Sequence, residues 1–168
     1  MSPKVLILMG SGSDWGLLQE TAAELDRLGV AWQAHVSSAH RTPERTVQLV
    51  RDGERDGVAV FICGAGMAAH LAGVVAAHTL RPVIGVPLPG GVADGLDALL
   101  ATVQMPGGIP VATVAVGKAG ARNAATLAAQ ILALSDPLLA ERLQQVRLAQ
   151  AAAVVEADKA LLTGRERS

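Results

Sequence analysis

Short runs of apolar and β-branched residues recur along the chain, each bounded by glycine or polar residues. Five of them predict β-strands, at Val5–Met9, Trp32–Ser37, Val58–Cys63, Val83–Val86 and Val111–Val116. Each run is almost continuously apolar, as expected of strands buried on both faces. Helical patterns lie between them, at Asp14–Leu28, Pro43–Arg55, Ala68–Thr79, Leu96–Val103 and Ala119–Leu134. This alternation predicts a three-layer α/β/α sandwich with a parallel five-stranded sheet.

A last amphipathic pattern predicts a long C-terminal helix over about 137–162. Pro137 follows Ser135 and Asp136, a sequence typical of a helix start. An apolar stripe runs along it, at Leu138, Leu139, Leu143, Val146, Ala149, Ala153 and Leu161. No strand follows this helix, so it either packs on its own sheet or extends over a neighbouring subunit. We expect residues 1–168 to form one domain, with its core over about 4–135.

Glycine and polar residues follow each of the first three predicted strands, in the segments "GSGSD", "SSAHRTPER" and "CGAGMAAHLAG". The carboxyl ends of parallel strands meet at one edge of a sheet, and ligands of open parallel sheets bind outside that edge. We therefore expect the three segments to form one site.

The first segment, residues 10–14, is suited to an anion. Its glycines allow close backbone approach, the following helix presents free N–H groups, and Ser11 and Ser13 add hydroxyl donors. A tight turn capped by Ser13, with Asp14 in the first helical turn, explains the same residues without a ligand.

A dinucleotide site at this segment is disfavoured. The glycines at Gly10, Gly12 and Gly16 are spaced one residue too widely for GxGxxG, and no acidic residue ends the second strand. A basic residue follows the second strand instead and suits a 2′-phosphate. The case for an NADP site is therefore weakened, but the residues do not exclude that site.

The second segment places two candidate residues before a helix. Thr42 and Pro43 form a helix start, with Thr42 as the cap and Pro43 in the first turn. Arg41 can bind a phosphate through two parallel hydrogen bonds. His40, beside the positive end of the helix dipole, is expected to stay neutral and to serve as an acid or base. A surface loop with an incidental His-Arg pair is the alternative interpretation.

The third segment is rich in small residues, which let a flat ligand lie against the backbone. His70 is predicted near the start of the following helix, where it lines the pocket or bonds to a neighbouring side chain. Cys63 ends a buried strand and is expected to belong to the core.

Composition excludes several classes of function. The net charge is -1, aromatic residues make up 2% of the chain, and tyrosine is absent, so nucleic-acid binding is not expected. A single cysteine and the absence of an HxxxH pattern argue against a metal site and an internal disulfide. The start of the chain lacks a signal-peptide pattern and no apolar run approaches a membrane span, so we expect a cytoplasmic protein.

A series of motifs resembles one family. "MGSGSDW", "SAHRTP", "GAGMAAHLAG", "PVIGVP", "GLDALL", "VQMPGGIPVATVAVGKAGARNAA" and "LAAQIL" occur in order between Val5 and Leu134. Together they resemble the class I 5-(carboxyamino)imidazole ribonucleotide mutases, the PurE family. The resemblance implies a flavodoxin-like fold, a homo-octamer, and a step of purine biosynthesis that needs no ATP, metal or other cofactor.

The reaction implied by the resemblance moves a carboxylate from the exocyclic nitrogen of a ribonucleotide to the neighbouring ring carbon. The carbamate loses carbon dioxide, the ring carbon attacks it, and a histidine, here His40, shuttles the proton. The resemblance also implies substrate contacts, with Asp14 suited to ribose hydroxyls and Arg41 to the phosphate. The further matching positions are Ser11, Ser13, Ser38, Ala65, Gly66 and His70.

Two positions depart from the family pattern: many members have glycine where this chain has Met67 and proline where it has Ala72. The stretch Leu88–Gly95 is also less typical, and no role is carried over to it. "SAHRTP" favours the mutase over the class II carboxylase, which uses free carbon dioxide. That carboxylase and a non-catalytic nucleotide-binding protein of the same fold are the alternatives.

Overall fold

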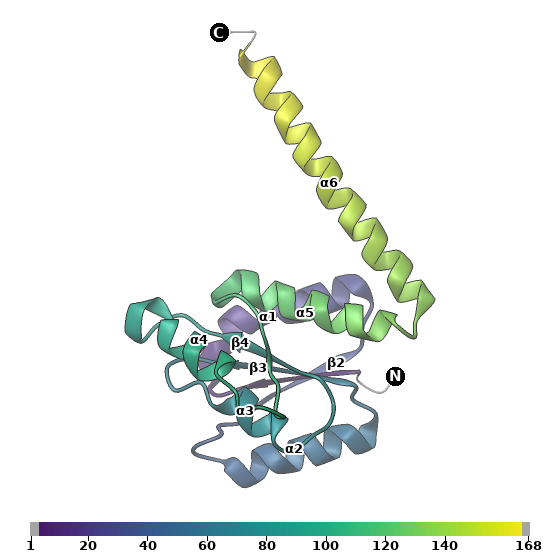
Figure 1. Cartoon of the computed structure of the whole chain (residues 1–168). Coiled ribbons are helices and arrows are strands. Elements are labelled where there is room, and N and C mark those ends of the chain that lie inside the picture. The colour runs from purple at the N-terminus through teal and green to yellow at the C-terminus, as the bar shows by residue number, and fades with distance from the viewer. Residues whose placement is uncertain (1–3, 166–168) are drawn as a thin grey trace.

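A parallel sheet of five strands lies between two layers of helices in the computed structural model, which describes residues 4–165 (Figure 1). The strands run in the order β2-β1-β3-β4-β5. Their bounds are Val5–Met9 for β1, Trp32–Val36 for β2, Val60–Ala65 for β3, Val83–Pro87 for β4 and Ala112–Thr113 for β5. This order is that of flavodoxin-like sheets, so the predicted fold class is confirmed.

The helices cover both faces of the sheet. α1 (Trp15–Leu28) and α5 (Gly117–Ala133) lie together on one face (Figure 1). α2 (Pro43–Asp56), α3 (Leu71–Ala76) and α4 (Leu96–Val103) lie on the other. Two single 3-10 turns, η1 (Gly12–Asp14) and η2 (Val92–Asp94), precede α1 and α4.

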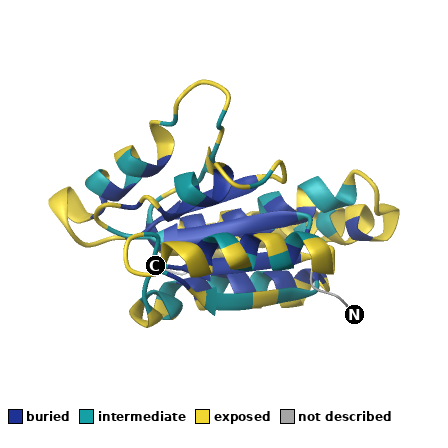
Figure 2. Cartoon of the chain, turned by 90° about the horizontal axis from the view of Figure 1, so that it is seen from below, coloured by how far each residue is buried: buried dark blue, intermediate teal, exposed yellow. Residues whose placement is uncertain are grey.

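Alternating side chains of β1 divide the interior into two cores. Val5, Ile7 and Met9 belong to the cluster that includes α1 and α5, whereas Leu6 and Leu8 belong to the cluster beneath α2 and α3. All five β1 side chains are buried, and β1, β3 and β4 form the buried centre of the molecule (Figure 2). A continuous apolar run is therefore what the central strand β1 requires, because both its faces are covered. The edge strands β2 and β5 are only partly buried, so the expected burial on both faces is wrong for these two.

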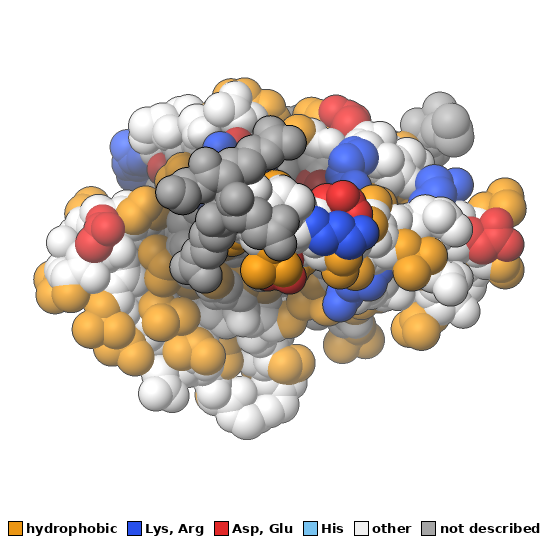
Figure 3. All heavy atoms as spheres, turned by 90° about the horizontal axis from the view of Figure 1, so that it is seen from above, with side chains coloured by type: hydrophobic (Ala, Val, Ile, Leu, Met, Phe, Trp, Pro, Cys, Tyr) orange, Lys and Arg blue, Asp and Glu red, His pale blue; other side chains and the backbone are white. Residues whose placement is uncertain are grey.

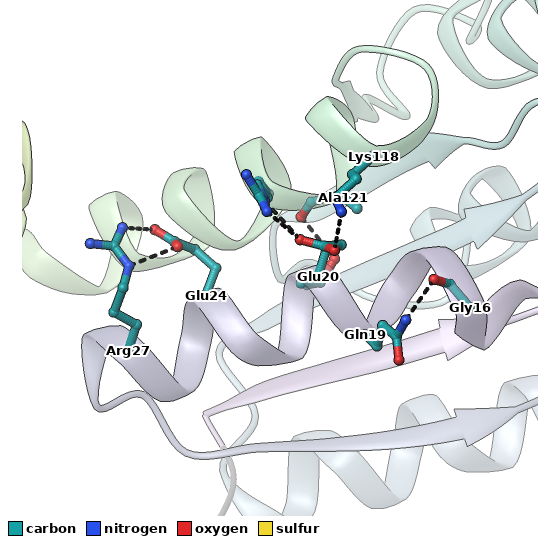
Figure 4. Close-up of polar contacts among 9 residues, drawn as sticks. Gly16, Gln19, Glu20, Glu24, Arg27, Lys118 and Ala121 are labelled. Carbon is teal, nitrogen blue, oxygen red and sulfur yellow. Dashed lines mark hydrogen bonds and ion pairs between the residues drawn. The ribbon is translucent and has the colours of Figure 1, made fainter. Parts of the chain in front are cut away.

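Helices α1 and α5 are joined by polar contacts as well as by their apolar faces. Glu20 of α1 lies between Lys118 and Arg122 of α5, at 2.7 Å from a side-chain nitrogen of each (Figure 4). The buried hydroxyl of Thr21 donates a hydrogen bond to the carbonyl oxygen of Ala121 at 2.8 Å. These contacts hold the amino-terminal halves of the two helices together near the loop after β1.

The long helix α6 (Pro137–Arg165) packs on the body only at its start and then extends away from it (Figure 1). Leu139 is buried in the α1–α5 core, and Arg142 donates a hydrogen bond to the carbonyl oxygen of Leu28 at 2.8 Å. From Arg147 to Thr163 every residue is exposed. None of the helices within residues 4–165 combines the length and hydropathy needed to span a membrane.

Several predicted elements differ from the observed ones by one or more residues, and three of these differences have local reasons. β3 covers residues 60–65 and not 58–63, because its pairing with β1 begins at Val60. Only two residues of the predicted fifth strand are assigned as strand, since this edge strand has β4 as its single neighbour. α3 begins at Leu71 and not at residue 68, because tight turns hold the segment before it.

Candidate functional site

A cleft of about 640 Å³ lies at the carboxyl ends of the strands, where the loops after β1, β2 and β3 meet. The switch in strand order between β1 and β3 opens this crevice, which is the usual ligand position in such sheets. The lining residues are Gly10, Ser11, Ser13, Asp14, Ser38, Ala39, His40, Arg41, Ala65, Gly66, Met67, Ala68, Leu71, Pro89, Gly90 and Gly91.

The loop after β1 is shaped by a reciprocal cap between Ser11 and Asp14. The backbone nitrogen of Ser11 donates to Oδ2 of Asp14 at 2.9 Å, and Oγ of Ser11 accepts from the backbone nitrogen of Ser13 at 3.3 Å. Burial raises the pKa of the Asp14 carboxyl from its ordinary value of 3.8, against the opposing effects of the Ser11 hydrogen bond and the Arg41 charge. Asp14 thus presents hydrogen-bond acceptors at the cleft wall, and Ser11, not Ser13, is the cap.

The loop after β2 carries the guanidinium of Arg41 across to the first loop. Nη2 of Arg41 donates to the carbonyl oxygen of Gly10 at 3.2 Å, and Nε donates to Oγ of Ser38 at 3.4 Å. The expected side-chain cap by Thr42 is absent, although Pro43 does begin α2. Oγ1 of Thr42 instead accepts from the backbone nitrogen of Ser38 at 3.0 Å, so the hydroxyl closes the loop that orients Arg41.

The two histidines of the predicted site contact each other. Nε2 of His40 lies 2.9 Å from Nδ1 of His70, and the rings meet edge to face with centroids 5.0 Å apart. One of the two nitrogens carries the hydrogen and donates it to the other, depending on the tautomer. Both imidazoles are exposed, and His40 lines the cleft, so this side chain can contact a molecule bound there.

The loop after β4 forms a wall that sequence reasoning missed. Pro89, Gly90 and Gly91 line the cleft directly beyond β4, and the backbone nitrogen of Gly90 donates to Oδ1 of Asp94 at 3.1 Å. These residues could have been predicted from their place after the fourth strand, because the loop there lies at the same edge of the sheet as the other three loops. The unusual composition of Leu88–Gly95 concealed it.

The structure brings the nine candidate residues together. Eight of them line the cleft: Ser11, Ser13, Asp14, Ser38, His40, Arg41, Ala65 and Gly66. His70 does not line it but contacts His40 from the position just before α3. Cys63 is buried in the core beneath α2 and α3, and this burial raises the pKa of its thiol.

Other hollows of similar size lack this convergence of polar loops. One of about 750 Å³ is lined by Glu54, Thr79, Arg81 and neighbours, with the carboxylate of Glu54 already accepting a hydrogen bond from Thr79. Within residues 4–165, no three histidine, cysteine, aspartate or glutamate side chains gather closely enough to hold a metal ion. The cleft at the strand ends is therefore the candidate functional site.

Known proteins resemble this chain over most of its length. The family model described as AIR carboxylase matches residues 4–153. A protein of Brucella melitensis named N5-carboxyaminoimidazole ribonucleotide mutase is 51% identical over 156 residues, which cover 93% of this chain and 96% of that protein. The Escherichia coli protein of the same name is 50% identical over 153 residues, covering 91% and 90%.

More distant relatives extend the similarity to the whole fold. The Mycobacterium tuberculosis protein with the same name is 47% identical over 165 residues, 97% of this chain and 94% of that protein. The crystal structure of Treponema denticola PurE superposes with a TM-score of 0.86 at 33% sequence identity, covering 94% of this chain and 97% of that one.

Proposed function

The chain belongs to the AIR carboxylase family, and from that premise we propose that it is an N5-carboxyaminoimidazole ribonucleotide mutase of purine biosynthesis. It is an isomerase that moves the carboxylate from the exocyclic nitrogen of the ribonucleotide to the adjacent ring carbon. The observation that carries the proposal is His40, which lines the cleft together with Arg41 and Asp14 and is in contact with His70.

The polar groups of the cleft divide between the two ends of a ribonucleotide. Arg41, held by its bonds to Gly10 and Ser38, offers the planar fork of donors that phosphate oxygens require. Asp14 accepts hydrogen bonds from ribose hydroxyls, beside Ser11 and Ser13. The small residues Ala65 and Gly66 leave room for the flat imidazole against the backbone.

In this binding mode the base reacts beside His40. The bond between the exocyclic nitrogen and the carboxylate carbon breaks, and His40 gives that nitrogen a proton. The ring carbon forms a bond to the carbon dioxide released, and its proton returns to His40. No proton is gained or lost overall, and the carboxylate leaves and rejoins the same molecule.

His70 supports both states of His40 in this cycle. The hydrogen between Nε2 of His40 and Nδ1 of His70 can sit on either nitrogen, so this contact persists while Nδ1 of His40 gives a proton to the substrate and takes one back. A partner that can act either way suits a residue that must both give and take a proton. His70 is thus a positioning residue, and His40 is the catalytic one.

The direct test is conversion of N5-carboxyaminoimidazole ribonucleotide to its carbon-carboxylated isomer by the purified protein without ATP. His40→Asn keeps a hydrogen-bonding side chain but cannot shuttle a proton, so we expect loss of turnover with nucleotide binding retained. Full activity in this variant would contradict the assigned role. Fluorescence or calorimetric titration with the ribonucleotide separates binding from catalysis.

The same assay distinguishes the alternatives. A class II carboxylase would require added bicarbonate or carbon dioxide and would act on the ribonucleotide that lacks the carbamate. A non-catalytic binding protein would bind the nucleotide without turnover. The names of the relatives, at 47% to 51% identity, favour the mutase over both.

We propose further that the protein is a homo-octamer in which α6 extends over a neighbouring subunit. Apolar side chains on the exposed part of α6 support this, namely Leu148, Val154, Val155, Leu161 and Leu162. Hydrophobic side chains are also visible across the face seen in Figure 3. Light scattering on the full chain is expected to give the mass of eight copies, and the mass of one copy would contradict the proposal.

A charged ribonucleotide substrate also favours a cytoplasmic location.

A further inference from the structure

Met67 combines features that packing of the chain leaves unexplained. Its φ angle of 52° lies in the left-handed region that favours glycine. Its side chain is 63% exposed, whereas Leu71, the other long aliphatic side chain that lines the cleft, is 2% exposed. Methionine at this position strains the backbone and adds little to the buried core, so folding stability does not account for it.

The position of Met67 links it to the reacting end of the cleft. It belongs to the same loop as His70, and it lines the same cleft as His40. Two tight contacts fix the backbone, with Ala69 nitrogen donating to the Met67 carbonyl at 2.9 Å and His70 nitrogen donating to the Ala68 carbonyl at 2.8 Å. A fixed loop thus carries an unbranched apolar side chain that is free to change its rotamer.

We propose that Met67 covers the reacting end of the bound nucleotide and retains the released carbon dioxide until the ring carbon captures it. This role presupposes the mutase reaction proposed above. Carbon dioxide is small and uncharged, so the polar groups that bind phosphate and ribose bind it only weakly. An apolar side chain across the opening excludes water and slows escape.

The test is a comparison of Met67→Gly with Met67→Leu in buffer containing isotopically labelled bicarbonate. Label enters the product only when the original carbon dioxide escapes and another molecule replaces it. We expect Met67→Gly to raise the labelled fraction by roughly three- to tenfold, because the escape barrier loses one apolar side chain. Released 5-aminoimidazole ribonucleotide should rise in parallel. Met67→Leu keeps the apolar bulk and should match the wild type.

Stability measurements separate this role from a structural one. Glycine relieves the left-handed strain, so the thermal midpoint of Met67→Gly should be no lower than that of the wild type. Met67→Ala, which keeps the strain and removes the cover, should leak in the same way. An unchanged labelled fraction in both variants, with normal turnover, would overturn the role of Met67 alone. Absence of turnover in the wild type would instead overturn the proposed mutase function.

Discussion

Replacing Arg41 with alanine removes the guanidinium that lines the cleft. Its two contacts within the chain, to Gly10 and Ser38, are both at an exposed position, so their loss should change the free energy of unfolding by less than about 0.5 kcal/mol. If Arg41 binds the substrate phosphate as proposed, the main loss is in substrate binding. Two charge-assisted hydrogen bonds to a phosphate contribute about 1.5 kcal/mol each at the low end appropriate to an open cleft, or about 3 kcal/mol together.

That energy corresponds to a weakening of roughly a hundredfold in the dissociation constant of the ribonucleotide. Arg41→Lys keeps the charge but loses the fork, so about tenfold is expected. Arg45→Ala serves as the control, because Arg45 lies on α2, is exposed and does not line the cleft. Isothermal titration with the nucleotide measures all three. Equal weakening by Arg41→Ala and Arg45→Ala would show a general charge effect and refute the phosphate contact.

Three further changes test the fold around the site. Burial raises the pKa of the Asp14 carboxyl, so the folded state binds a proton at this group more readily than the unfolded chain does. At neutral pH the ionised carboxylate therefore lowers the stability of the folded state. This destabilisation disappears as the pH falls through the folded-state pKa. Asp14→Asn should therefore raise the neutral-pH thermal midpoint slightly while increasing KM, and a lowered midpoint would contradict this. Gly120→Ala should lower the free energy of unfolding, measured in urea, by more than about 3 kcal/mol, because the added Cβ would lie 1.6 Å from the carbonyl oxygen of Ala115. Gly16→Ala is the control, because a Cβ at Gly16 would meet no atom within 4 Å and should not destabilise the fold. The Cys63 thiol, buried and with a raised pKa, should react with a thiol reagent only after unfolding.

The sequence predicted the architecture because its strongest signals are local and repeated. The apolar run of Val5–Met9 must be covered on both faces, and alternation with helices leaves a parallel sheet as the solution. The strand ends then place residues 10–14, 37–45 and 63–73 at one edge without any knowledge of contacts. The grouping of His40 and Arg41 with Asp14 follows from that placement alone.

Contacts between distant segments lay beyond this reasoning. Nothing local indicates that His70 bonds to His40, because the pairing depends on where two loops separated by 30 residues meet. The hydroxyl of Thr42 was expected to cap α2, yet Ser38 competes for it within the same loop. The wall formed by Pro89 to Gly91 was missed because glycine-rich loops contribute backbone, and backbone has no residue-specific signal.

The exposed part of α6 has a consequence for how its sequence is constrained. Both cores and all four walls of the cleft are complete before Arg147, and every residue from there to Thr163 is exposed. Substitutions in that stretch therefore leave the packing of the chain's own body unchanged. Selection for a stable monomer has no means of preserving the apolar side chains found there. If related sequences retain these apolar side chains, the retention would reflect selection for contact with another molecule and not selection for folding of the single chain.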